Sequence, residues 1–185
     1  MTRPEIHIRH AEPADAVQWQ SLRAALWPEE DPASLAADVS RFFSTPRRGP
    51  GSMPEAVLVA AAGRSQSIVG FAEISRRAYA EGCETSPVGF LEGWYVAPEY
   101  RPQGVGRALV AAVEVWAQSL GCREFASDAL AENTISAAAH RALGFEEVVI
   151  IRCFRKGLTS DAATQPAHTA EGPEGRGAPL ARRPP

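Results

Sequence analysis

The chain has 185 residues, a length that suits one domain with an appendage. Its 22 acidic residues outnumber its 19 basic ones, which disfavours nucleic acid as the main partner and allows a cationic one. It has no apolar run long enough for a membrane span and no signal-peptide pattern at its start, so we expect a cytoplasmic protein. Three cysteines and four scattered histidines lack metal-type spacing, and we expect reduced thiols and no metal.

Apolar periodicity in the first half predicts alternating strands and helices. In chain order these are a strand at 5–9, a helix at 14–26, a second helix beginning at 32, and an antiparallel strand pair at 56–62 and 68–75. Asp31 and Pro32 form a good N-cap and first helical residue for the second helix.

The second half contains one long apolar strand followed by shorter elements. The pattern predicts a central strand at 88–97, a helix at 105–120 closed by Gly121, a short strand at 124–127, a helix capped by Asn133 or Thr134, and a final strand from Val148 to Phe154. Residues 157–185 are rich in Pro, Gly and Ala without periodicity, and we expect disorder there. The expected organisation is therefore a domain at 1–156 and a tail at 157–185.

A glycine-bearing turn between the central strand and its following helix is suited to bind an anion. It reads Arg101-Pro102-Gln103-Gly104-Val105-Gly106-Arg107. Amides at a helix N-terminus are unpaired and carry the positive end of the helix dipole. The two glycines leave the backbone accessible to a pyrophosphate, and the two arginines add charge. A Walker loop is excluded because the chain's single lysine is Lys156, and a dinucleotide-binding loop is weakly supported because Leu109 replaces the third glycine.

The pattern Arg-x-x-Gly-x-Gly after a strand resembles the acetyl-CoA pyrophosphate loop of the GNAT N-acetyltransferase superfamily. A second GNAT-like motif follows, from Asn133 through a short helix to Leu143-Gly144-Phe145, where Gly144 suits a left-handed helix end. The resemblance implies an α/β fold: a single GNAT domain whose mixed, mostly antiparallel central sheet is flanked by helices and splayed at the cofactor cleft. It also implies that the loop and Asn133 bind acetyl-CoA.

The central strand carries two features suited to acyl transfer. Gly93 favours a β-bulge, which would turn free N–H groups of Trp94, Tyr95 and Val96 into the gap beside the strand. In GNAT folds this gap admits the pantetheine arm, and such an N–H can polarise the thioester carbonyl. A glycine that only relieves crowding is the alternative.

Glu92 lies in the middle of one apolar strand and Asp128 directly after another, where burying an unpaired charge is costly. Glu92 either faces the cleft as a base, directly or through water, or is buried in an ion pair with an arginine; we favour the cleft. Asp128 follows the short strand at the end that opens onto the cofactor crevice, although it could also cap a turn.

A closer resemblance, to the aminoglycoside 6′-N-acetyltransferases, covers nearly all of residues 5–156. It rests on Leu26-Trp27-Pro28, on Tyr79-Ala80-Glu81-Gly82-Cys83-Glu84-Thr85-Ser86-Pro87-Val88, on Phe90-Leu91-Glu92-Gly93, on Gly121-Cys122-Arg123-Glu124, on Ala126-Ser127-Asp128 and on Glu132-Asn133-Thr134-Ile135-Ser136. The resemblance implies that Trp27, Tyr79, Glu92 and Asp128 line a pocket for a small polycationic amine. Carboxylates for ammonium groups and aromatic faces for sugar rings suit such a ligand. Trp27 could instead be a core residue.

The chain departs from the family pattern at the acid that protonates the departing thiolate. Many GNAT enzymes have a tyrosine four residues before the glycine of Leu-Gly-Phe, and this chain has His140. Histidine could donate that proton, or it could be a helix residue with a satisfied ring. The same resemblance makes a homodimer plausible. Acetylation of another amine, such as a polyamine or a peptide N-terminus, and a CoA-binding module without turnover are the alternatives.

Overall fold

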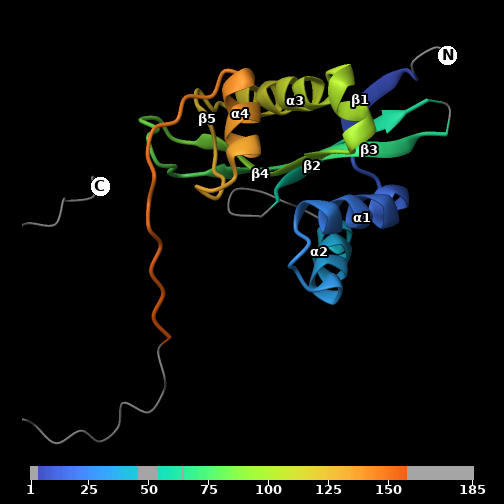
Figure 1. Ribbon diagram of the computed structural model, residues 1–185, viewed down its shortest axis with the longest axis horizontal. Coiled ribbons are helices and arrows are strands. Elements are labelled where there is room, and N and C mark those ends of the chain that lie inside the picture. The colour runs from blue at the N-terminus through green and yellow to red at the C-terminus, as the bar shows by residue number, and fades with distance from the viewer. Residues whose placement is uncertain (1–3, 46–53, 64, 158–185) are drawn as a thin grey trace, which may run out of the picture. The chain divides into compact units, whose positions relative to one another are not determined.

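The computed structural model describes residues 4–45, 54–63 and 65–157 (Figure 1). Its elements are β1 (Ile6–His10), the 3-10 turn η1 (Pro13–Asp15), α1 (Ala16–Leu26), α2 (Pro32–Ser44), β2 (Ala56–Ala62), β3 (Ser67–Arg77), β4 (Val88–Val96), the 3-10 helix η2 (Pro98–Gln103), α3 (Val105–Ser119), β5 (Phe125–Ser127) and α4 (Thr134–Ala142). None of the described helices has the length and apolar character needed to span a membrane. The chain divides into two units, residues 1–150 and 151–185, and every described helix and strand belongs to the first.

A five-stranded sheet in the order β1-β2-β3-β4-β5 organises the first unit. The first three pairings are antiparallel, and β4 and β5 are parallel. Helices α1 and α2 cover one face and α3 and α4 lie on the other (Figure 1). The predicted fold class is therefore confirmed: a mixed, mostly antiparallel sheet flanked by helices.

The predicted helix ends are confirmed where the sequence supplied a cap. The Asp31 carboxylate accepts a hydrogen bond from the Ser34 amide at 3.0 Å, which fixes the start of α2. Asn133, rather than Thr134, caps α4 by accepting from the Ser136 amide at 3.0 Å. Gly144 follows α4 with φ +96°, a conformation that side chains rarely adopt, so glycine is required there.

The bulge predicted at Gly93 is present in β4. Glu73 pairs with Gly93 and Ile74 with Leu91, so Glu92 is the extra residue. The β4–β5 pairing ends at Leu91 opposite Ser127, whereas the β3–β4 pairing continues to Val96. Within the described residues, β4 beyond Leu91 consequently has a strand neighbour on one side only, and the sheet is open at this point.

The predicted final strand from Val148 to Phe154 is wrong in this structure: residues 145–157 contain neither helix nor strand. Alternating apolar residues make a strand only when a neighbouring strand accepts their backbone hydrogen bonds. Val148 instead packs against Gly82, in the space that a Cβ on Gly82 would occupy. Most of the predicted tail, residues 158–185, lies outside the described residues, so the boundary at 156 stays a prediction.

Candidate active site

The predicted anion-binding loop links the end of β4 to α3. Gly104 has φ +77° and directly precedes the helix, while a Cβ there would meet nothing within 4 Å. Glycine is thus needed for the backbone conformation, not for space. The amides of the first turn of α3 have no intrahelical acceptors, and the exposed side chains of Arg101 and Arg107 flank them. The loop therefore offers both amide donors and positive charge to an anion.

The two arginines are held in place by backbone carbonyls. Arg101 Nε donates to the carbonyl oxygen of Val96 at 2.9 Å, and its guanidinium lies 5.5 Å from the Tyr95 ring centre. Arg107 Nη2 donates to the carbonyl oxygen of Ala142 at 2.9 Å. Gln103 turns its amide back to the carbonyl of Glu99 at 3.2 Å. No further hydrogen bond joins either guanidinium to the described part of the chain, so their other N–H groups can donate to phosphate oxygens.

Gly106 has a different role from the one that the sequence suggested. A Cβ on Gly106 would lie 2.6 Å from Cζ2 of Trp94, so this glycine lets the indole pack against α3. The Trp94 ring also meets the His140 ring edge to face, with centres 6.0 Å apart. Its Nε1 is buried and has no hydrogen-bond partner among the described residues. Trp94 thus connects the anion-binding loop to α4.

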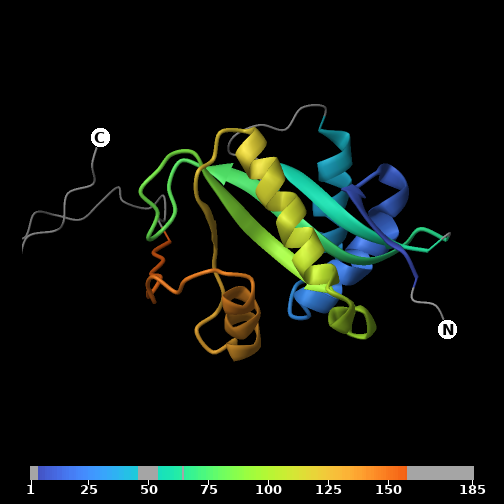
Figure 2. The ribbon, with the colours of Figure 1, turned by 90° about the horizontal axis from the view of Figure 1, so that it is seen from above.

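His140 on α4 is fixed through both ring nitrogens. Nδ1 lies 2.8 Å from the carbonyl oxygen of Ser136, and Nε2 lies 3.0 Å from the hydroxyl of Ser127. Phe145 packs against the same ring with centres 5.1 Å apart. The sequence offered a satisfied ring as the alternative to an acid, and the ring is satisfied; its catalytic role stays a prediction. Figure 2 shows α4 beside the sheet edge, while α3 lies across the strands.

Glu92, the bulge residue, forms the ion pair that the sequence left as the alternative to a free carboxylate. Its carboxylate contacts the Arg77 guanidinium and accepts a hydrogen bond from the Ser75 hydroxyl. Arg77 also lies over the Phe90 ring, 3.4 Å from its centre. Glu92 is partly buried on β4, and its neighbours Arg77 and Ser75 fix the orientation of its carboxylate.

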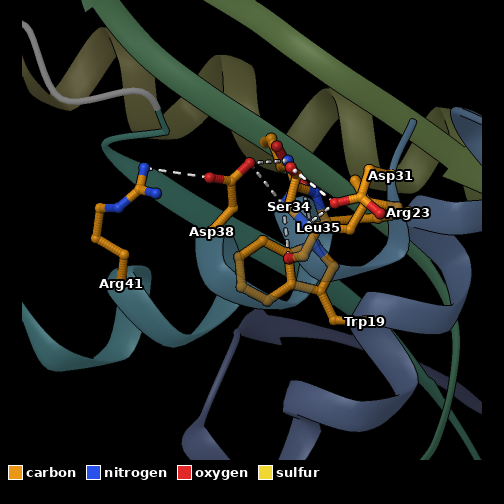
Figure 3. A network of polar contacts seen from close by, with 8 residues as sticks. Trp19, Arg23, Asp31, Ser34, Leu35, Asp38 and Arg41 are labelled. Atoms are coloured by element: carbon orange, nitrogen blue, oxygen red, sulfur yellow. Dashed lines mark hydrogen bonds and ion pairs between the residues drawn. The ribbon is translucent and has the colours of Figure 1, made fainter.

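A buried charge cluster on the opposite face of the sheet from α3 was not predicted. Glu73, with 2 % of its surface exposed, forms an ion pair with Arg23 at 2.9 Å and accepts a hydrogen bond from Trp19 Nε1 at 3.0 Å. Arg23 reaches on to Asp38 of α2 at 3.4 Å, and Asp38 pairs with Arg41 (Figure 3). The signal was a glutamate inside the apolar strand 68–75, the same signal that drew attention to Glu92.

Burial raises the pKa of Glu73 from its ordinary value to about 7, and the nearby Arg23 and the Trp19 hydrogen bond offset only part of that rise. The carboxyl therefore gains or loses its proton near neutral pH. Arg23 Nε lies 2.9 Å from Oε1 of Glu73, but its N–H does not point at that oxygen. The contact is therefore an ion pair without a hydrogen bond from Nε.

Trp27 ends α1 and packs on the bulge of β4. A Cβ on Gly93 would lie 2.6 Å from Cη2 of Trp27, and the Arg23 guanidinium lies 5.0 Å from the Trp27 ring centre. The ring also meets Phe71 of the core, with centres 6.3 Å apart. The structure thus brings Trp27 beside the bulge, and the ring has a packing role whether or not it also binds substrate.

Tyr79 and Asp128 lie at the surface. Tyr79 is 64 % exposed, and Asp128 is exposed directly after β5. The loop that carries Tyr79 is tied to β5 through Glu124, whose carboxylate accepts hydrogen bonds from the Glu84 and Thr85 amides and the Thr85 hydroxyl. These donors hold the pKa of Glu124 below its ordinary value. The loop is positioned near the short strand, but its tyrosine contributes little to packing.

Sequence reasoning missed the partners of its own candidate residues. Ser127 belonged to a quoted motif but received no role, and Arg77 and Ser75 were not connected to Glu92. These contacts join strands and helices that are far apart in the sequence, so spacing carries no signal for them.

Comparison with known proteins gives one consistent result. The family model described as acetyltransferase (GNAT) family matches residues 17–145. An aminoglycoside N(6′)-acetyltransferase type 1 from Klebsiella aerogenes is 47% identical over 151 residues, which cover 82% of this chain and 96% of that protein. One from Stenotrophomonas maltophilia is 45% identical over 156 residues, covering 84% and 95%.

Among solved structures, the enzyme AAC(6′)-Iy in complex with the bisubstrate analogue CoA-S-monomethyl-acetylneamine superimposes with a TM-score of 0.73 at 38% identity, covering 83% of this chain and 99% of that one. The AAC(6′)-Ih enzyme from Acinetobacter baumannii gives the same TM-score at 36% identity, covering 84% and 100%.

Proposed function

Because this chain belongs to the acetyltransferase (GNAT) family, we propose that it transfers the acetyl group of acetyl-CoA to the 6′-amine of aminoglycosides, by direct attack of the amine in a ternary complex. The observation that carries the proposal is the anion-binding loop of Gly104 beside the open edge of β4. The loop suits a pyrophosphate, and the open edge gives an extended arm access to the bulge. Relatives at 45% and 47% identity act on aminoglycosides by name.

For acetyl-CoA, the residues present fit the co-substrate. The first-turn amides of α3, with Arg101 and Arg107, would hold the pyrophosphate, and acetyl-CoA supplies an activated thioester. Trp94, Tyr95 and Val96 follow the bulge on the open strand, where a free N–H would polarise the thioester carbonyl. Asn133 would contribute indirectly, because its side chain is used to cap α4.

The amine would occupy the region around the β4 bulge and the loop of Tyr79. In this proposal Trp27 and Tyr79 contact the sugar rings, and Glu92 and Asp128 bind ammonium groups. Glu92 takes the proton of the attacking amine, directly or through water, and Arg77 holds its carboxylate in position. Asp128 is exposed, and its negative charge would bind a multiply charged antibiotic in a salt-dependent way.

The test is CoA release measured against a panel of amines: a 6′-amino aminoglycoside, the matching antibiotic with a 6′-hydroxyl, spermidine and a peptide with a free N-terminus. We expect turnover with the first compound only. Turnover with spermidine or the peptide would favour acetylation of another amine. Binding of acetyl-CoA without turnover on any amine would favour a non-catalytic module.

The pocket assignment is tested by Glu92→Gln and Asp128→Asn, with Asp38→Asn as an acidic control outside the proposed pocket. Asp128→Asn should raise the KM for the aminoglycoside, less so at high salt, and leave that for acetyl-CoA unchanged. Glu92→Gln should also lower kcat if Glu92 is the base. Wild-type kinetics in both variants would reject the pocket.

A homodimer is also part of the proposal. Val148, Val149 and Ile150 are 60%, 51% and 70% exposed, an unusual apolar run on a protein surface. The strand β5 also has no described strand on its outer side. A second copy of the chain that packs here would bury the exposed apolar side chains and cover the outer edge of β5. Light scattering after size-exclusion chromatography should give a mass of twice the 19.8 kDa chain. A monomer at micromolar concentration would exclude this.

A further inference from the structure

We propose that Ser127 relays a proton from His140 to the thiolate that leaves during acetyl transfer, so that His140 acts through a serine and not by direct contact with sulfur. The inference rests on the proposed acetyltransferase function. It assigns a catalytic role to a residue of β5 that the sequence did not single out.

The contacts of His140 favour one arrangement of its ring hydrogens. Nδ1 lies 2.8 Å from the carbonyl oxygen of Ser136, which can only accept, and 3.3 Å from the Ser136 hydroxyl, which can donate or accept. The shorter contact favours the tautomer with a hydrogen on Nδ1, and the relay starts from it. Nε2 then either accepts from the Ser127 hydroxyl or, in the imidazolium, donates to it at 3.0 Å. The only ring proton that can leave without breaking the Ser136 contact is therefore the one on Nε2, and it leads to Ser127.

The Ser127 hydroxyl lies where the sheet opens. It is 3.2 Å from the carbonyl oxygen of Leu91, and Leu91 opposite Ser127 is the last paired position between β4 and β5. The next residue of β4 is Glu92 in the bulge. His140, by contrast, is enclosed by the rings of Trp94 and Phe145 and presents no free N–H. The serine is thus better placed than the histidine to meet a group in the gap.

The proton balance closes on these atoms. The relay requires a hydrogen on each ring nitrogen of His140 at the start: Nδ1–H donates to the Ser136 carbonyl, Nε2–H donates to Ser127, and the Ser127 hydroxyl donates to the Leu91 carbonyl. When the carbon–sulfur bond breaks, its electron pair goes to sulfur. Ser127 gives its hydroxyl proton to sulfur, and its Oγ takes the Nε2 proton. His140 is left neutral with its hydrogen on Nδ1, and solvent restores the second proton before the next turnover.

The alternative is that Ser127 only ties α4 to the sheet. The variant Ser127→Ala distinguishes the proton relay from this structural role. Ser119→Ala is the matched control, because Ser119 also donates to a backbone carbonyl, that of Trp116, and lies at the C-terminal end of α3. We expect Ser127→Ala to lower the rate of single-turnover acetyl transfer at least tenfold and to leave the KM for acetyl-CoA within twofold of the wild type. The wild-type rate should fall at high pH because the general acid loses its proton, and this fall should be absent in Ser127→Ala. Ser127→Thr, which keeps the hydroxyl, should restore most of the rate.

Nitrogen NMR of the histidine rings tests the same path without turnover. Neutral His140 should carry its hydrogen on Nδ1 in the wild type and in Ser127→Ala, and the Nε2 resonance should shift in the variant because it loses its partner. An Nε2–H tautomer in the wild type, or a wild-type rate and pH profile in Ser127→Ala, would overturn the relay. Absence of wild-type turnover on every amine would instead reject the proposed function, while the spectra still decide the hydrogen-bond path.

Discussion

The two faces of the sheet are stabilised in different ways. The α3 face is apolar: Leu58, Ala60 and Ala72 pack against Leu109 and Val113 of α3. The α1 and α2 face contains Trp19 and Phe71 but also encloses Arg23 and Glu73. Apolar burial is insensitive to pH, whereas a buried carboxyl whose pKa is about 7 is not. The contribution of the α1 and α2 face to the free energy of unfolding should therefore change with pH, whereas that of the α3 face should not.

The largest effect should come from removing one partner of the buried pair. Arg23→Met leaves Glu73 buried without its cation, and breaking such a pair costs about 3 to 5 kcal/mol of unfolding free energy. The loss should be smaller at pH 5.5 than at pH 8, because Glu73 then takes a proton. Urea unfolding at both pH values measures it.

The control for this prediction lies on the other face. Leu109 is fully buried, and Leu109→Ala should cost about 2 to 5 kcal/mol, equally at both pH values. A pH-dependent loss in Leu109→Ala, or a pH-independent one in Arg23→Met, would contradict the comparison.

The next effect is the pH dependence that Glu73 itself contributes. Its pKa is raised in the folded protein from 4.5 to about 7, so its contribution to stability is complete below pH 4.5 and is lost as the pH rises through 7. Relative to Glu73→Gln, the wild type should lose on the order of 3 kcal/mol across that window. Parallel stability curves for the two proteins would show that Glu73 titrates normally.

A smaller effect is expected at the anion-binding loop on the α3 side. Arg101→Ala should raise the KM for acetyl-CoA by a factor that corresponds to about 1.5 to 3 kcal/mol, with the KM for the aminoglycoside nearly unchanged. Gly104→Val should act in the same direction because φ is +77° at this position. Equal changes in both KM values would place the co-substrate elsewhere.

The smallest effect should be the loss of a helix cap on the α1 and α2 face. Asp31→Ala removes the acceptor for the Ser34 amide and should cost about 1 kcal/mol. Asp31→Asn keeps an acceptor oxygen and should lose little. A cost as large as that of Arg23→Met would mean that α2 depends on Asp31 for more than its cap.

Most of the fold could be predicted from local chemistry. The helix starts at Pro32 and Thr134, the strand 56–62 and the bulge at Gly93 follow from caps, alternation and a glycine, which act within a few residues. The final strand could not, because a strand requires a partner ladder and the sequence pattern says nothing about whether one is present. The role of Gly106 was also missed, since its close neighbour, Trp94, comes from another element.

The sequence by itself determined the order of the elements, the anion-binding loop and the resemblance that led to acetyl transfer. These depend on short-range backbone preferences and on motifs in adjacent residues. Only the tertiary structure decided that Glu92 pairs with Arg77, that Glu73 is buried beside Arg23, and that His140 reaches Ser127. The physical reason is that hydrogen bonds and ion pairs depend on distance in space, and packing brings together side chains whose separation in the sequence ranges from 13 to 50 residues.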